Sequence, residues 1–79
     1  MNQSAYDRII SGKSDNNILF SDFQNVIEGV GFEFKRQKGS HMVYSNPDIS
    51  ERMVIQKDGS KAKSYQVRQL RDIINKHGL

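Results

Sequence analysis

The spacing of the apolar residues changes abruptly at Gly31 in this chain of 79 residues. Before Gly31, apolar side chains recur at the i, i+3, i+4 and i+7 positions of one helical face, at Phe23, Val26, Ile27 and Val30. After Gly31, Phe32 and Phe34 alternate with charged residues, as in a half-buried strand. A glycine at such a junction is typical of a helix C-terminus. The chain is therefore predicted to pass directly from a helix into a sheet.

The residues before this junction predict two helices. Residues 4–12 place apolar side chains one helical turn apart and predict a short helix, and a polar loop is expected over residues 12–17. Ser21 precedes Gln24 by three positions, which is the spacing of a capping box. We therefore expect the second helix to begin with Ser21 as its N-cap.

Turn residues divide the middle of the chain into three short segments that favour strands. The first follows Phe32, the second covers residues 41–45 and the third covers residues 52–56. They are separated by Lys38-Gly39-Ser40 and Asn46-Pro47-Asp48. Connections this short join neighbouring antiparallel strands. The sequence therefore predicts a three-stranded antiparallel meander.

The last part of the chain returns to the helical period. Residues 65–77 place four apolar side chains on one face, with Gly78 as the C-cap: Val67, Leu70, Ile73 and Ile74. The predicted fold class is α+β, a single domain over residues 1–79 with the two longer helices on one face of the sheet and the other face open. The residues expected in its core include Phe23, Phe32, Phe34 and Leu70.

The sequence lacks the residues that several classes of binding and catalytic site require. The absence of cysteine excludes disulfides, thiolate metal sites and a cysteine nucleophile, and it is compatible with a reducing cytosol. The two histidines, His41 and His77, lie far apart in the sequence, and no glycine-rich nucleotide-binding loop occurs. No apolar run is long enough to cross a membrane, and the polar start is unlike a signal peptide. We expect no metal, no cofactor and no membrane contact.

Charge is unevenly distributed along the chain, whose formal net charge is +3. Residues 1–32 hold two basic and four acidic side chains, whereas residues 33–71 hold nine basic and four acidic ones. Lysines and arginines that meet phosphates release condensed counterions, so a polyanion would be attracted to the second segment. The alternative is that these groups form an ordinary solvated surface.

The turn between the first two predicted strands carries the most informative run of residues, Arg36-Gln37-Lys38-Gly39-Ser40-His41. Gly39 permits a positive φ angle and close approach of a ligand, and successive free amides at such a turn can bind an anion. Arg36 and Lys38 add positive charge, and Ser40 adds a hydroxyl. Beside a phosphate held there, His41 would provide the acid–base group for RNA scission. A histidine at a strand start is also a common surface or packing residue.

This run, with Gly31-Phe32 before it and Val43-Tyr44 after it, resembles the HicA-type toxins of bacterial toxin–antitoxin pairs. The segment of residues 61–67, Lys-Ala-Lys-Ser-Tyr-Gln-Val, resembles the corresponding stretch of a longer subgroup, as does Ile55-Gln56 before it. The similarity runs from about Ile18 to Leu79. Residues 1–17 then form the subgroup's variable leader.

The resemblance implies a fold like a double-stranded-RNA-binding domain. It also implies a ribosome-independent endoribonuclease that cleaves single-stranded mRNA in the cytoplasm, and a cognate antitoxin of the HicB type as protein partner. The family's catalytic histidine maps onto His41. The expected RNA-binding residues are Arg36, Lys38, Gly39, Ser40, Lys61 and Lys63.

Two positions depart from the family's pattern. Many relatives carry a second histidine after the third strand, where this chain reads Gln56-Lys57-Asp58-Gly59. The second proton-transfer partner is therefore open, and Lys38, Lys63 or solvent would serve. Position 64 is serine where subgroup members often have proline, and serine can also cap a helix. His77, in the last helical turn, is expected to be structural.

Other readings of the chain stay open. A non-catalytic RNA-binding module of the same fold would bind RNA in a salt-dependent way without cleaving it. A protein-interaction domain would use its basic face to bind an acidic partner. For Lys61 and Lys63 the alternative to phosphate contact is a solvated loop. Tyr44 is expected either half-buried or stacked on a base, and Tyr65 either packs on the sheet or touches RNA.

Overall fold

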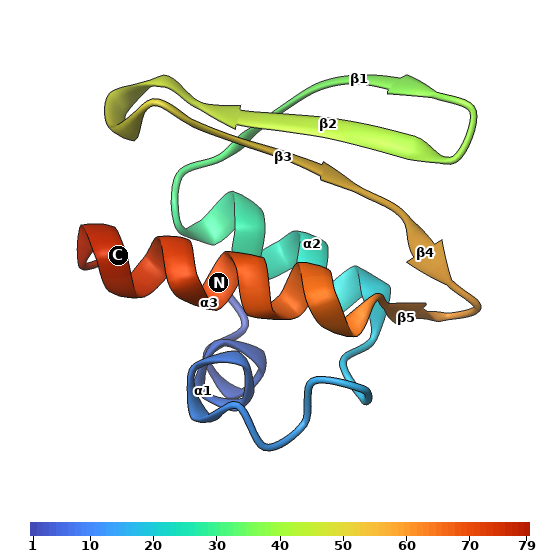
Figure 1. The fold of residues 1–79 in the computed structure, drawn as a ribbon, viewed down its shortest axis with the longest axis vertical. Helices are drawn as coiled ribbons and strands as arrows, with labels where there is room; N and C mark the ends of the chain where they lie inside the picture. Colours follow the sequence, from blue (N-terminus) through green and yellow to red (C-terminus); the bar gives the residue numbers. More distant parts are fainter.

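Three helices and a three-stranded sheet form two layers in the computed structural model, which describes residues 1–79 (Figure 1). The helices are α1 (Gln3–Ser11), α2 (Phe20–Gly29) and α3 (Ser64–His77). The sheet contains β1 (Glu33–Lys38), β2 (His41–Asn46) and β3 (Glu51–Ile55), with a single 3-10 turn at Pro47–Ile49 between β2 and β3. A short hairpin of β4 (Lys57–Asp58) and β5 (Lys61–Ala62) leads into α3.

The sheet has the order β1-β2-β3 with antiparallel pairing throughout, which confirms the predicted meander. Both α2 and α3 lie on one face of it, and no helix covers the other face (Figure 1). This α-β-β-β-α arrangement, preceded by α1, is the layout of a double-stranded-RNA-binding domain. The predicted α+β fold class is therefore confirmed.

The junction at Gly31 has the predicted form. Gly31 takes a φ of +109°, and its N–H donates to Glu28 O at 3.1 Å. The N–H of Phe32 reaches back to Ile27 O at 3.1 Å, which completes a Schellman motif. The side chain of Phe32 is buried at 3% exposure. The single glycine thus ends α2 and directs Phe32 into the core.

The predicted N-cap at Ser21 is wrong. Helix α2 begins at Phe20 with Leu19 as its N-cap, and no side chain caps it. The reason is tertiary: Phe20 N donates to Ser60 O at 2.9 Å, and Leu19 bridges to Lys61 in β5. This pairing fixes the helix start before Ser21. Helix α3 likewise begins at Ser64, after Lys63, without a side-chain cap.

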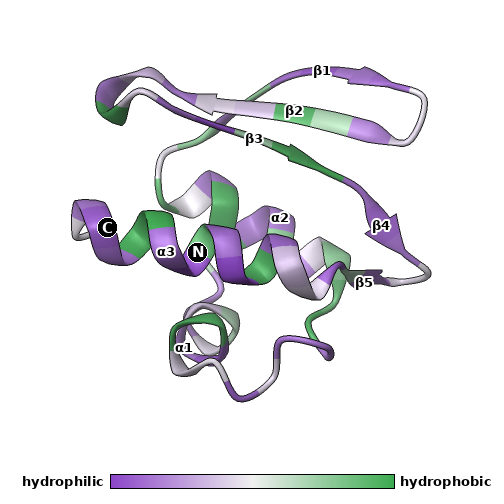
Figure 2. Cartoon of the chain, viewed as in Figure 1, coloured by the Kyte–Doolittle hydropathy of each residue, from purple (hydrophilic) through white to green (hydrophobic).

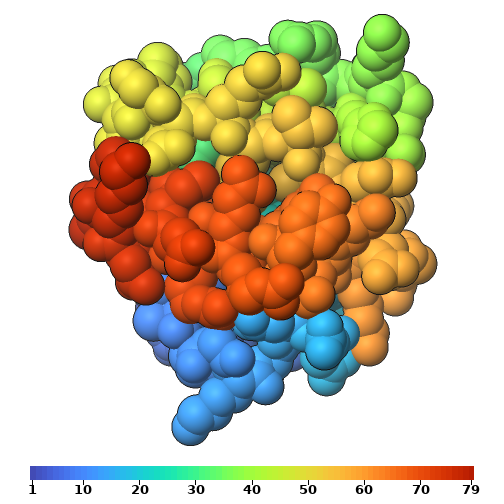
Figure 3. Space-filling model, viewed as in Figure 1, coloured from blue at the N-terminus to red at the C-terminus, as the bar shows by residue number.

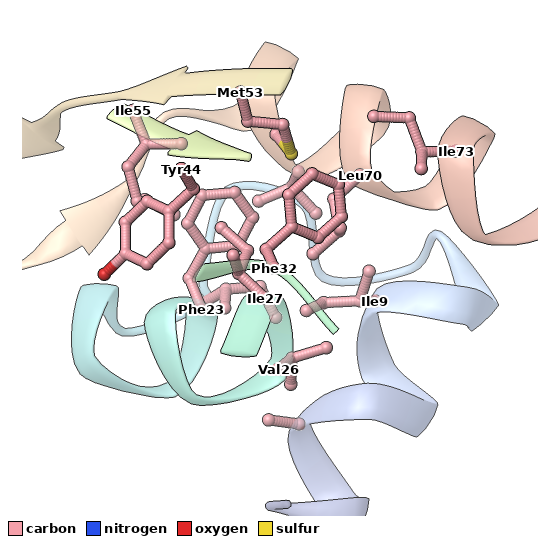
Figure 4. Close-up of a cluster of buried hydrophobic side chains, with 14 of the residues drawn as sticks. Ile9, Phe23, Val26, Ile27, Phe32, Tyr44, Met53, Ile55, Leu70 and Ile73 are labelled. Carbon is pink, nitrogen blue, oxygen red and sulfur yellow. The ribbon is translucent and has the colours of Figure 1, made fainter. Parts of the chain in front are cut away.

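One core gathers side chains from all three helices and the sheet (Figure 4). Ala5 and Ile9 of α1 are buried in it, so the expected leader packs against the same core as the rest of the chain. Arg71 of α3 fastens the following loop, because it pairs with both carboxylate oxygens of Asp15, at 2.8 and 3.1 Å, and donates to Ile9 O. The carboxylate of Asp15 raises the pKa of Arg71.

Phe34 is not in the core, contrary to the prediction. It pairs with Tyr44 across the strands and therefore faces the helix side, but β1 is an edge strand and 47% of Phe34 stays exposed. Its ring meets the ring of Tyr44 edge-on, with the centroids 5.5 Å apart. The alternation of apolar residues identified the correct face. The alternation could not show how far the helices extend beneath that face, and they do not cover Phe34 at the edge.

Candidate functional site

The turn between β1 and β2 is a tight and open hairpin. Lys38 pairs with His41, so only Gly39 and Ser40 lie between the strands. Gly39 has a φ of +59° and Ser40 does not have a positive φ, as in a type II′ turn. Their N–H groups donate no hydrogen bond within the protein, and a Cβ placed on Gly39 would meet nothing within 4 Å. The turn therefore offers two free amide donors to a ligand.

A β-bulge determines which side chains share a face with His41. The pairing shifts between Phe34, opposite Tyr44, and Arg36, opposite Val43. Since cross-strand partners point to the same side, the shift moves Arg36 from the helix side to the open face. Lys38, two residues further along β1, follows it. Arg36, Lys38 and His41 thus come together on the face that no helix covers.

These three side chains have no charged partner within the protein. All are exposed, and none of the four ion pairs of the structure includes them. The neighbouring Lys35 differs, because its Nζ lies 2.8 Å from Glu33 Oε2. The hydrogen bond from Lys35 lowers the pKa of Glu33. The positive charge available to a ligand at the hairpin therefore comes from Arg36 and Lys38.

Lys61 and Lys63 lie at the same end of the molecule as the hairpin turn (Figure 1). Lys61 is exposed in β5, where it pairs with Asp58, and the half-buried Lys63 is the N-cap of α3. Figure 2 shows that β1, β4 and β5 are hydrophilic at this end. The structure thus places the predicted RNA-binding residues at one end of the fold, without a direct contact between the lysines of β5–α3 and His41.

Gln66 connects α3 to this end of the sheet, a role that the sequence analysis missed. Its side chain accepts a hydrogen bond from Gln56 N and donates one to Val54 O, both at 3.1 Å. Gln66 is buried among the apolar residues of α3, four positions before Leu70 and seven before Ile73. The sequence does contain a signal for this role, because Gln66 is a polar residue at a position of the apolar stripe of α3 and a buried amide needs hydrogen-bond partners.

No second histidine lies near His41. Met42 pairs with Ile55, the last residue of β3, and Gln56 is the residue that follows the strand at this end. His77 lies at the opposite end of the sheet, where its Nε2 is 2.8 Å from Glu51 Oε2. This ion pair fastens the C-terminal turn of α3 to the start of β3.

The two tyrosines that were left open differ in exposure. Tyr44 is 1% exposed and belongs to the core, so its ring is closed to a ligand. Its burial raises the pKa of the phenol, whose oxygen lies 3.3 Å from Gln24 Nε2 and 3.4 Å from Glu28 Oε2. Tyr65, on the first turn of α3, is 55% exposed.

The arrangement around His41 suits an anion that must exchange a proton. Free amides and two unpaired cations bind negative charge, and the imidazole can accept or release a proton beside it. The structure contains no group of three or more potential metal-ligating side chains. None of its helices has the length and apolar character that a membrane crossing needs.

A comparison with protein families gives one match, described as HicA toxin of bacterial toxin-antitoxin, over residues 20–79. Neither the curated proteins nor the solved structures include a match to the chain. The matched residues contain α2, the whole sheet, α3 and therefore the His41 turn, and they leave out α1. Since the match extends over more than half of the sequence, the chain belongs to the HicA toxin family of bacterial toxin–antitoxin systems.

Proposed function

We propose that this toxin is an endoribonuclease that cleaves mRNA without the ribosome, with His41 as its acid–base group. Membership of the family makes the chain the toxin of a toxin–antitoxin pair and implies an antitoxin partner. One observation carries the choice of chemistry. The exposed His41 stands opposite Lys38, beside two free turn amides, on a sheet face that no helix covers.

In the proposed reaction, the Gly39 and Ser40 amides and Lys38 bind the oxygens of one phosphate of the RNA. His41 removes the proton from the 2′-hydroxyl of the preceding ribose, and the 2′-oxygen attacks the phosphorus. The bond to the 5′-oxygen breaks, which gives a 2′,3′-cyclic phosphate on one fragment and a 5′-hydroxyl on the other. The proton ends on the departing 5′-oxygen, carried by the same ring or through water. DNA lacks the 2′-hydroxyl and is therefore no substrate.

The remaining predicted residues would bind RNA further from the reacting phosphate. Arg36 lies along β1 on the same face, and Lys61 and Lys63 lie at the same end of the fold. Their contribution would be the salt-dependent attraction of the backbone. We propose that single-stranded mRNA in the cytoplasm is the substrate and that a HicB-type antitoxin inhibits the toxin by covering His41.

The His41→Ala variant tests this proposal. Purified free of antitoxin and incubated with single-stranded RNA in EDTA, it should cleave about 10²–10⁴ times more slowly than wild type, with RNA affinity nearly unchanged. Cleavage is resolved on a denaturing gel, and growth arrest on expression gives a second readout. Normal cleavage by the variant would show that the assignment of His41 is wrong.

One observation favours a second candidate, a non-catalytic RNA-binding module. The residue that follows β3 at the His41 end of the sheet is Gln56 rather than a second histidine, and His77 is engaged with Glu51 at the far end of the sheet. Such a module would bind RNA without cleaving it, and residue 41 would make no difference. The gel assay separates the two functions, because only the nuclease gives fragments that disappear in the alanine variant.

A further inference from the structure

An open groove of about 510 Å³ runs along α3 beside β3, apart from the residues assigned to RNA above. Tyr65 and Arg68 line it near the start of α3, and Glu51 and Lys76 line it near the end. Figure 3 shows this face of the molecule, on which the orange and red atoms of α3 lie beside the yellow and orange atoms of β3. The two ends of the groove differ in what they offer a ligand.

The Tyr65 end presents a fixed aromatic ring to solvent. Gln66 Nε2 lies 3.4 Å from Tyr65 Oη and 3.1 Å from Val54 O, so the phenol is held against the edge of β3. Val54 is itself 38% exposed, and Tyr65 is 55% exposed. Tyr65 is thus an exposed ring at the edge of the strand that carries Val54 on the open face. An aromatic ring held in this way is a platform on which an unpaired base can stack.

The free positive charge of the groove lies at the same end. Arg68 is three residues beyond Tyr65, so both side chains are on one face of α3. Arg68 is exposed and forms no ion pair, even with Asp72 one turn further along. At the other end of the groove, Lys76 is 3.6 Å from Glu51 and its charge is largely compensated. Asp72 also lines the groove and is unpaired, so Arg68 is the one unpaired cation there on which a phosphate would bind, with a carboxylate one turn beyond it.

The Tyr65 end of the groove borders β3, the strand next to β2, which carries His41. Val54 pairs with Val43 on the open face, and His41 is two residues before Val43 in β2. β3 lies between the β2 row of His41 and Val43 and the end of α3 that carries Tyr65, and adjacent strands lie about 4.8 Å apart. An RNA strand with its reacting phosphate at His41 can extend its neighbouring nucleotides across Val54 to the groove.

We propose that this groove is a second RNA subsite, in which an unpaired base stacks on Tyr65 while a backbone phosphate meets Arg68. The proposal rests on the proposed function, whose site it extends. Stacking tolerates every base, and a base within a duplex cannot make it. The subsite therefore selects single-stranded RNA with little preference for sequence.

Binding is tested in the His41→Ala background, where cleavage does not interfere. The probe is a fluorescein-labelled single-stranded RNA of about eight nucleotides, followed by anisotropy. Adding Tyr65→Ala should weaken binding about 5- to 150-fold, whereas Tyr65→Phe should bind like the parent, because the ring remains. Arg68→Ala should reduce the slope of log affinity against log salt by about 0.7. Lys13→Ala, an exposed cation outside the groove, is the matched control.

Three results would overturn the subsite. The first is RNA binding by Tyr65→Ala that equals the parent's, and the second is a loss of affinity in Tyr65→Phe as large as in Tyr65→Ala. The third is a Tyr65→Ala variant that weakens only the complex with the antitoxin, which would assign the groove to a protein. Circular dichroism confirms that each variant is folded. Failure of the proposed function would look different, since His41→Ala would then cleave RNA normally. The binding series would in that case be run on the same RNA with 2′-O-methyl groups, which cannot be cleaved by attack of the 2′-oxygen, and it would still decide on the groove.

Discussion

A histidine lies at each end of the three-stranded sheet, His41 in β2 at one end and His77 of α3 against the other, and the two rings differ in their surroundings. At the corner end, between β2 and β3, His77 is bonded to Glu51, and Asn46 Nδ2 donates to Val30 O. At the hairpin end, His41 is exposed and has no hydrogen-bond or ion-pair partner within the protein. Acidic and amide side chains close the first end, whereas cations surround the second.

The difference indicates a structural role for His77 and leaves His41 available for chemistry. The ring of His77 is half-buried and fastens α3 to the start of β3 through Glu51, away from the unpaired cations of the hairpin end. A ring among unpaired cations gains nothing for the fold and is available to an anion. The comparison therefore supports the proposal that the chemistry belongs to the hairpin end, and the predictions that follow each test one part of it.

The largest expected effect is the contrast between the two histidines in RNA cleavage. His41→Ala should lose about 3 to 5 kcal/mol of transition-state stabilisation, which corresponds to the expected loss in rate. His77→Ala should cleave RNA like wild type, because its ring is at the other end of the sheet. Initial rates on one RNA substrate measure both variants. Equal losses in the two would break the comparison.

The next effect compares two glycines, one at each end, by urea unfolding. Gly31→Ala should cost about 2 to 3 kcal/mol, because the residue has a φ of +109° and its Cβ would lie 3.0 Å from Asn46 Nδ2. Gly39→Ala should cost only about 1 kcal/mol, because it has a φ of +59° but open space around it. A larger cost at Gly39 would mean that the hairpin end is the more constrained one.

A similar measurement addresses how the hairpin end is held. Gln66→Leu should destabilise the protein by about 1 to 3 kcal/mol, because it leaves Gln56 N–H and Val54 C=O without their partner. Gln69→Leu, on the exposed face of the same helix, is the control and should change the urea midpoint little. If both variants unfold alike, the Gln66 bonds contribute nothing to stability.

The smallest effect is a dependence on pH at the corner end. The hydrogen bond with His77 lowers the pKa of Glu51 from 4.5, so the unfolded chain binds this proton more readily than the folded one. The stabilisation is therefore present above the unfolded pKa and is lost as the pH falls through the folded pKa. Wild type should lose more stability than Glu51→Gln between about pH 5 and pH 3. Parallel urea midpoints for the two proteins would contradict this.

Much of the fold could be predicted from local pattern. The change of period at Gly31 gave the helix end, the strands followed from their turns, and the stripe of α3 was correct to Gly78. The errors came where tertiary contacts override local preference. The β5 pairing of Leu19 moved the start of α2 away from Ser21, and the edge position of β1 left Phe34 exposed.

The candidate site was predictable in its residue types but not in its geometry. The run from Arg36 to His41 indicated a turn with cations and a histidine. The bulge that brings Arg36 to the face of His41 depends on how β1 and β2 pair, which alternation alone cannot specify. The role of Gln66 could not be predicted for a related reason, because its hydrogen-bond partners are the backbone groups Val54 O and Gln56 N on another element.

The amide of Gln66 has a consequence for how the toxin behaves when it is released from its antitoxin. An outer strand with unpaired backbone groups is a template on which other chains can add strands and aggregate. On the outer side of β3, Gln66 already occupies Val54 O and Gln56 N, as a neighbouring strand would do. A strand added at this point would have to displace the Gln66 side chain first, so one amide protects this edge of the sheet.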